Sequence, residues 1–290
     1  MPNDFHLQIL IMILTALFFL AAFFVGFRQM HAATVTPSPA RSQLDSSMGL
    51  PARLLLLLGI LAALSLVVWR AFHSGRITLP LSNHMDSFLL LALLLAILII
   101  YCRATRNLRA LAFFLLPVSS ALLLVGAILS FISPLDYSYH SIWSFVHIAS
   151  IVVGTACTAG ACAGAITFLI ASTQLKRKGR AGAEGSRRWI GLPSLASIER
   201  FNRTFIFIGF PLLTIGIITG ILRFAQHPLS ITNNWSLASK TTLAFAAWFI
   251  YLLLVQLPFT PSFRGQRAAW LSILGFTLFL AAYVAANWMN

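Results

Sequence analysis

Residues 144–173 read SFVHIASIVVGTACTAGACAGAITFLIAST, a run of 30 residues without Asp, Glu, Lys or Arg. A helix of about 20 apolar residues is long enough to cross the hydrocarbon core of a membrane. Comparable apolar runs occur at 7–27, 54–72, 88–102, 110–131, 205–224, 240–257 and 268–288. Because only helices and closed barrels satisfy backbone polar groups in lipid, the sequence predicts an all-α, polytopic transmembrane bundle of about eight spans.

The composition and the connecting segments support this organisation. Of the 290 residues, 59% are hydrophobic and 9% are charged, which is too apolar for an ordinary soluble domain. The run at 88–102 is the shortest and is polar at its start. We expect residues 1–53 to hold the first span and a Pro/Ser-rich linker, and residues 54–290 to form the main transmembrane domain. Residues 195–202 are predicted to form a separate amphipathic helix on the inner face.

The basic residues predict the orientation of the chain. Of the 20 Lys and Arg residues, 16 lie in the segments after the first, third, fifth and seventh spans. The other four are Arg70, Arg76, Arg223 and Lys240. Cytoplasmic loops carry the excess of basic residues, so both termini are predicted to lie outside. The net charge of +14 therefore reflects topology and contact with the lipid bilayer, and does not indicate nucleic-acid binding.

His147 is the first candidate site residue, because it lies about one turn inside a span. An ionisable side chain there is costly and by default marks a site. A neutral imidazole is also a good axial ligand for haem iron. The alternative is a hydrogen-bonded packing residue. The three cysteines, Cys102, Cys157 and Cys162, follow no ligand or redox spacing and are predicted to be small buried residues.

The predicted outer loops gather further polar and aromatic candidates. They contain four more histidines, namely His73, His84, His140 and His227. His84 and His227 are candidate ligands, although His84 next to Asp86 is also typical of an Asp–His surface pair. Trp235 lies in the polar stretch 232–236, where its ring can stack on a porphyrin.

Two cations flank that stretch. Arg223 and Lys240 can pair with carboxylates such as haem propionates. The alternative is that both side chains extend from helix ends towards the membrane surface.

Residues 192–223, LPSLASIERFNRTFIFIGFPLLTIGIITGILR, resemble the cytochrome c assembly family, the CcsA/CcmC/HemX-type haem-handling membrane proteins. Further segments resemble this family in the expected order, from about residue 70 to residue 287. These are 75–86 (GRITLPLSNHMD), Pro117, 143–147 (WSFVH), 235–248, 265–268 (GQRA) and 275–276 (GF).

The resemblance implies a haem site. Full-length members bind haem at an external tryptophan-rich loop flanked by two ligand histidines, the first of which matches His147. The loop matches 233–240, where Trp235 and Lys240 are retained, while Leu237 and Ala238 replace a Trp and an Asp. The second external histidine has no counterpart before Asn290. A further histidine within the membrane aligns with Gln256. These departures resemble the HemX-like or accessory members.

We therefore expect a multi-pass protein of the cell inner (cytoplasmic) membrane that binds non-covalent, b-type haem at its outer face in cytochrome c biogenesis. His147 is the expected axial ligand and His84 or His227 the second. Expected partners are haem, other cytochrome c assembly membrane proteins and apocytochrome c.

No protein nucleophile or acid–base pair is evident, which favours binding over catalysis. The alternative is a HemX-like accessory or regulatory protein of tetrapyrrole synthesis or cytochrome assembly without tight haem binding. A transporter is disfavoured because no span carries paired acidic residues.

Overall fold

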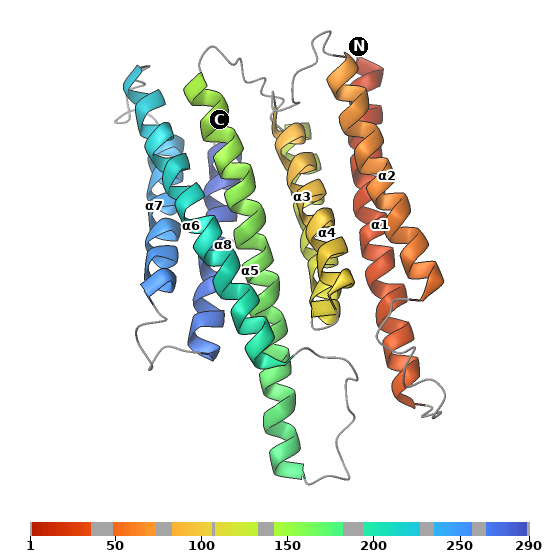
Figure 1. Ribbon diagram of the computed structural model, residues 1–290. Helices are drawn as coiled ribbons and strands as arrows, with labels where there is room; N and C mark the ends of the chain where they lie inside the picture. The colour runs from red at the N-terminus through yellow and green to blue at the C-terminus, as the bar shows by residue number, and fades with distance from the viewer. Residues whose placement is uncertain are drawn as a thin grey trace.

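The computed structural model describes residues 2–35, 49–73, 83–105, 108–132, 142–181, 194–226, 235–256 and 265–288. These residues form eight α-helices and no strand (Figure 1). The helices are α1 (Pro2–Val35), α2 (Leu50–His73), α3 (His84–Ala104), α4 (Arg109–Ile132), α5 (Ile142–Ala181), α6 (Leu195–Gln226), α7 (Trp235–Gln256) and α8 (Gln266–Trp288). The predicted all-α fold is confirmed.

Seven of the described helices are long and apolar enough to cross a membrane. The predicted third run belongs to one of them, Met85–Ala104, and is therefore longer than the sequence suggested. The shortest apolar helix is instead in α7, where the stretch Thr241–Gln256 covers fewer residues than the other candidate spans. The chain is thus a multi-pass helical membrane protein. Helix α7 has the shorter apolar stretch and packs in the same bundle, against α6 and α8.

The helices run alternately up and down, so that the start of α1 and the end of α8 lie at the same end of the bundle (Figure 1). We call this the His147 end, because α5 also begins there. It holds the starts of α1, α3, α5 and α7 and the ends of α2, α4, α6 and α8. The start of α1 and the end of α8 therefore share one side, and that this side is the outside stays a prediction from the distribution of Lys and Arg.

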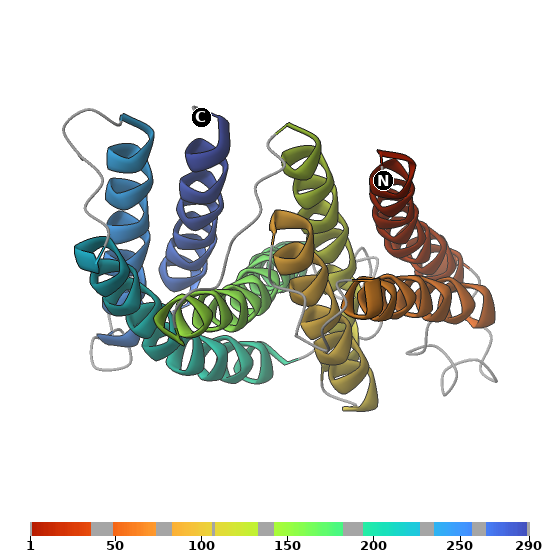
Figure 2. The ribbon, with the colours of Figure 1, turned by 90° about the horizontal axis from the view of Figure 1, so that it is seen from above.

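Helix α5 occupies the centre of the bundle (Figure 2). It packs against α6 and α8 on one side and against α3 and α4 on the other. In an apolar stretch of 18 residues of its span, 78% of the residues are buried, compared with 28% in the spans of α2, α6 and α8. Small residues make this position possible, since Ala, Gly, Cys and Thr form most of its middle. A site on α5 is therefore held between the two groups of helices.

The first turns of α6 correct one prediction. Residues 195–202 do not form a separate surface helix, because α6 is continuous from Leu195 to Gln226. Ile198 is fully buried and Phe201 is 6% exposed. Phe201 lies close to Gly164 of α5. The apolar side of this amphipathic stretch is thus covered by protein, which keeps it in line with the span that follows.

Candidate functional site

His147 lies on α5, one turn from its start, and is partly buried against α6. Its Nδ1 atom is 2.7 Å from the backbone carbonyl oxygen of Gly216. A carbonyl oxygen only accepts hydrogen bonds, so Nδ1 carries the hydrogen and donates it. In the neutral ring, Nε2 then keeps its lone pair, which is the state that a histidine needs to ligate a metal.

The α6 surface opposite His147 consists of small residues. Gly216 and Gly220 follow the G-x-x-x-G spacing, which lets two helices in a membrane approach closely. A Cβ atom on Gly220 would lie 2.9 Å from the Cε1 atom of His147, and one on Gly216 would lie 2.9 Å from the Cγ1 atom of Ile151. The ring of His147 therefore occupies space that only glycine at position 220 leaves open.

Thr219 lies beside the same ring. Its Oγ1 atom is 3.4 Å from Nδ1 of His147 and 2.7 Å from the carbonyl oxygen of Ile215 in its own helix. The Thr219 hydroxyl donates its hydrogen to Ile215 within α6. Its oxygen can therefore act only as a weak second acceptor for the N–H of His147 Nδ1. Ser150 closes the group by donating to the carbonyl oxygen of His147 at 2.9 Å. The sequence did not single out Gly216, Thr219 or Gly220 as site residues.

The structure places the backbone of four other predicted site residues at the His147 end. Arg223 lies in α6, three residues after Gly220, and His84 begins α3. Trp235 begins α7, so it belongs to a helix and not to the loop that the sequence predicted, and Lys240 lies on the second turn of the same helix. The side chains of these four residues, and the whole of His140 and His227, lie outside the described part of the chain.

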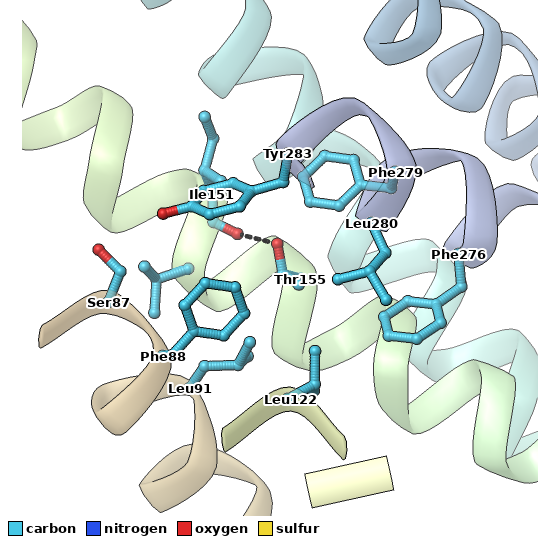
Figure 3. A pocket seen from close by; sticks show the side chains of 11 residues that line it. Ser87, Phe88, Leu91, Leu122, Ile151, Thr155, Phe276, Phe279, Leu280 and Tyr283 are labelled. Carbon is cyan, nitrogen blue, oxygen red and sulfur yellow. Dashed lines mark hydrogen bonds between the residues drawn. The ribbon is translucent and has the colours of Figure 1, made fainter. Parts of the chain in front are cut away.

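A narrow crevice of about 40 Å³ opens close to His147, between α3, α4, α5 and α8. Ile151, one turn after His147, forms part of its α5 wall, while Ser87 and Phe88 form part of its α3 wall. Figure 3 shows the Tyr283 side chain reaching from α8 across the crevice towards the side where Ser87 lies. The rings of Tyr283 and Phe88 meet edge to face, with centroids 5.1 Å apart. The lining is almost entirely apolar.

A buried ion pair lies at the same end and was not predicted. Arg70 of α2 donates through Nε to Oδ1 of Asp86 in the first turn of α3, and through Nη1 to Oε1 of Gln8 in α1. The Asp86 side chain is fully buried and that of Arg70 is 12% exposed. The carboxylate of Asp86 is therefore buried and faces α2, and does not lie at the surface as the sequence suggested; the side chain of His84, its other expected partner, lies outside the described part of the chain. Of the acidic side chains described, Asp86 is the one inside the helix bundle.

The donor that the structure describes at this end, His147, is of the kind that haem iron accepts. Among the described residues no group of three or more His, Cys, Asp and Glu side chains could hold a metal. Haem iron needs only one or two protein ligands, since the porphyrin nitrogens supply the others. His147, whose neutral ring carries a lone pair on Nε2 when Nδ1 donates to Gly216, is a ligand of the kind that haem iron binds.

Comparisons with known proteins give the family. The model of the family described as "Cytochrome C assembly protein" matches residues 81–290. The "Inner membrane protein YpjD" of Escherichia coli K12 is 29% identical over 176 residues, which are 60% of this chain and 63% of that protein. The "Cytochrome c biogenesis protein CcsA" of Guillardia theta is 25% identical over 227 residues, 73% of this chain and 74% of that protein.

A further CcsA, from Porphyra purpurea, is 33% identical over 96 residues, 33% of this chain and 29% of that protein. This chain thus spans less than two thirds of the length of the Escherichia coli relative. No solved structure matches it. The family model covers well over half of the chain, in one continuous block that runs from the start of α3 to the end of the sequence. The chain therefore belongs to the cytochrome c assembly protein family.

Proposed function

We propose that this protein binds haem at the His147 end of the bundle and presents it during cytochrome c biogenesis. The observation that carries the proposal is the hydrogen bond from Nδ1 of His147 to the carbonyl oxygen of Gly216, at 2.7 Å. In the neutral ring this bond keeps the hydrogen on Nδ1 and the lone pair on Nε2, which is the atom that would bind iron. Haem is the cargo here, and the chain holds it without chemical change.

We assign the remaining site residues proposed roles that agree with their places along the chain. Arg223 comes one turn after Gly220 on α6, and residues three apart share a helix face. It is therefore a suitable partner for a haem propionate next to His147. Lys240 is the second propionate partner and Trp235 the stacking ring, both at the start of α7. His84 at the start of α3 and His227 are the two candidates for the second axial ligand.

The direct test uses purified full-length protein in detergent, titrated with ferric haem and followed by its Soret band. The parent should bind haem with the spectrum of a histidine-ligated iron. His147→Ala should weaken binding by about tenfold or more, since it removes an iron ligand. His31→Ala is the matched control, because His31 lies near the other end of α1, and it should bind as the parent does. Equal binding by His147→Ala and the parent would refute the ligand assignment.

The second axial ligand can be found with the same assay. His84→Ala and His227→Ala are compared in the ferric and ferrous states. Loss of the low-spin spectrum in one of them, with haem retained through His147, identifies the partner. If both variants keep the parent spectrum, neither histidine is the second ligand.

A second candidate function is that of a HemX-like accessory protein without tight haem binding. One observation favours it: Trp235, Leu237 and Ala238 lie in the first turn of α7 and not in an open loop. If the parent protein binds haem no better than His147→Ala, but still co-purifies with other cytochrome c assembly proteins, this function replaces the first.

A further inference from the structure

Three helices meet at the buried ion pair of Arg70 and Asp86. Arg70 comes from α2, Asp86 from the first turn of α3, and Gln8 from α1. Gln8 is 8% exposed and Asp86 is fully buried. The family match begins at residue 81, so Asp86 lies inside it while Gln8 and Arg70 lie in the preceding helices. This polar cluster therefore ties the α1–α2 hairpin to the matched part of the chain.

Stability alone is a weak reason for such a pair. Removing two charges from water is costly, and apolar residues of similar volume often pack as well or better. What a charge pair provides is a fixed geometry, because Arg70 can satisfy both acceptors in only a narrow range of positions. In a chain that is 59% hydrophobic, apolar packing at this place would be the simple alternative. The Arg70–Asp86 pair is thus better explained by its effect on the position of the neighbouring residues of α3.

The residues next to Asp86 form the α3 wall of the crevice. The backbone N–H of Asp86 donates to Oδ1 of Asn83 at 3.1 Å, which caps the helix there. Ser87 and Phe88 follow directly and line the crevice. On the opposite wall, Ile151 lies one turn after His147. A shift of Asp86 would therefore move one wall of the crevice relative to the helix that carries His147.

We propose that Asp86 is a positioning residue which, held by Arg70 and Gln8, sets the α3 wall of the crevice against α5 below His147. The α1–α2 hairpin is then part of the site and not only a membrane anchor. The effect on haem rests on the proposed function, whereas the effect on the crevice does not. The two are therefore measured separately.

The first measurement needs no haem. Ser87→Cys places a thiol in the crevice wall, while the native Cys102, Cys157 and Cys162 are buried. Its rate of labelling by a maleimide is compared in the parent, in the neutral pair Arg70→Met/Asp86→Leu and in the exchanged pair Arg70→Asp/Asp86→Arg. We expect a several-fold change in the neutral pair and partial recovery in the exchanged pair.

The matched control removes a different ion pair. Arg203 and Glu199 lie 3.9 Å apart on the surface of α6 and are exposed. Glu199→Leu/Arg203→Met should leave the labelling rate of Ser87→Cys unchanged. If the neutral pair does not fold, Gln8→Met and Arg70→Lys take its place. Each weakens the contacts of the cluster without leaving a buried charge unpaired, and each should change the labelling rate by a smaller factor.

The second measurement is the haem spectrum. The neutral pair should retain His147 ligation but show a shifted Soret maximum and faster haem loss, with recovery in the exchanged pair. Unchanged labelling and an unchanged spectrum in the folded neutral pair would overturn the proposal and leave a purely stabilising role. If the parent binds no haem, the proposed function fails, and the labelling rates still decide whether Asp86 positions the crevice wall.

Discussion

The Nδ1 atom of His147 and the carbonyl oxygen of Gly216 lie 2.7 Å apart across the interface between α5 and α6. This contact joins the histidine within the span of α5 to the backbone of the most characteristic part of the sequence. It also explains why α6 carries glycine at two positions one turn apart. The geometry of the site thus depends on the α5–α6 packing as much as on the histidine.

Gly220→Ala tests that dependence. The new Cβ atom would lie 2.9 Å from Cε1 and 3.3 Å from Nδ1 of His147, well inside the normal contact distance of about 3.5–4.0 Å. The ring must shift away from position 220, and the resulting strain on its orienting hydrogen bond to Gly216 should lower haem affinity by about tenfold or more. Haem titration of the purified variant measures this.

Gly164→Ala is the control for that experiment. Its Cβ atom would meet Phe201 at 3.4 Å, which is an ordinary contact, on the same pair of helices. It should bind haem as the parent does. Parent-like affinity in Gly220→Ala would show that the ring position does not matter for binding.

The hydrogen bond between α6 and α7 gives a second prediction. The indole N–H of Trp248 donates to Oγ1 of Thr214 at 2.9 Å, and the ring of Trp248 stacks on Phe210. Thr214→Val keeps the shape but leaves the N–H without this acceptor. Such bonds in membranes contribute about 1 kcal/mol, so the thermal unfolding midpoint in detergent should fall by a few degrees.

Thr204→Val serves as its control, because that hydroxyl donates to the carbonyl oxygen of Arg200 in its own helix. Its unfolding midpoint should equal that of the parent. If Thr214→Val shows no drop beyond this control, the bond from Trp248 contributes nothing measurable to the packing of α7.

The sequence predicted the helices well, because they depend on local patterns, and a local pattern also singles out His147 as a candidate. Long apolar runs fix the spans, and an ionisable residue within one of them is conspicuous. The partner of His147 could not be predicted in the same way, since a backbone carbonyl oxygen leaves no signature in the sequence. The G-x-x-x-G spacing of Gly216 and Gly220 was the one available sign of a close approach, and it does not say which helix approaches.

Tertiary contacts explain the failures. Trp235 was predicted to lie in a loop because Asn, Thr and Ser surround it, yet α7 begins there. Asp86 was expected at the surface, but its carboxylate is buried against Arg70, 16 residues away along the chain. Only the packing of α2 against α3 brings these two charges together. The residues next to Trp235 and Asp86 in the sequence therefore did not predict the helix start at Trp235 or the burial of Asp86.

Gly126→Ala tests the packing of the first four helices. Its Cβ atom would lie 2.5 Å from Cβ of Phe88 and 2.6 Å from Cε of Met12, so α1, α3 and α4 cannot all keep their places. Overpacking of this kind costs about 1–3 kcal/mol. We expect a clearly lower unfolding midpoint and less monodisperse protein on size-exclusion chromatography. Phe88 lines the crevice. An unfolding midpoint equal to that of the parent would therefore mean that the α3 wall can shift at little cost in stability.

The orientation of the bundle is tested by two substituted cysteines at opposite ends. His6 of α1 lies at the His147 end and Ser194, just before α6, lies at the other, and both are exposed. Because 16 of the 20 Lys and Arg residues lie in segments at the Ser194 end, that end should face the cytoplasm. In intact cells, a membrane-impermeant maleimide should label His6→Cys but not Ser194→Cys, and both should react after lysis. The reverse pattern would place His147 on the cytoplasmic side, so that haem would have to be bound there.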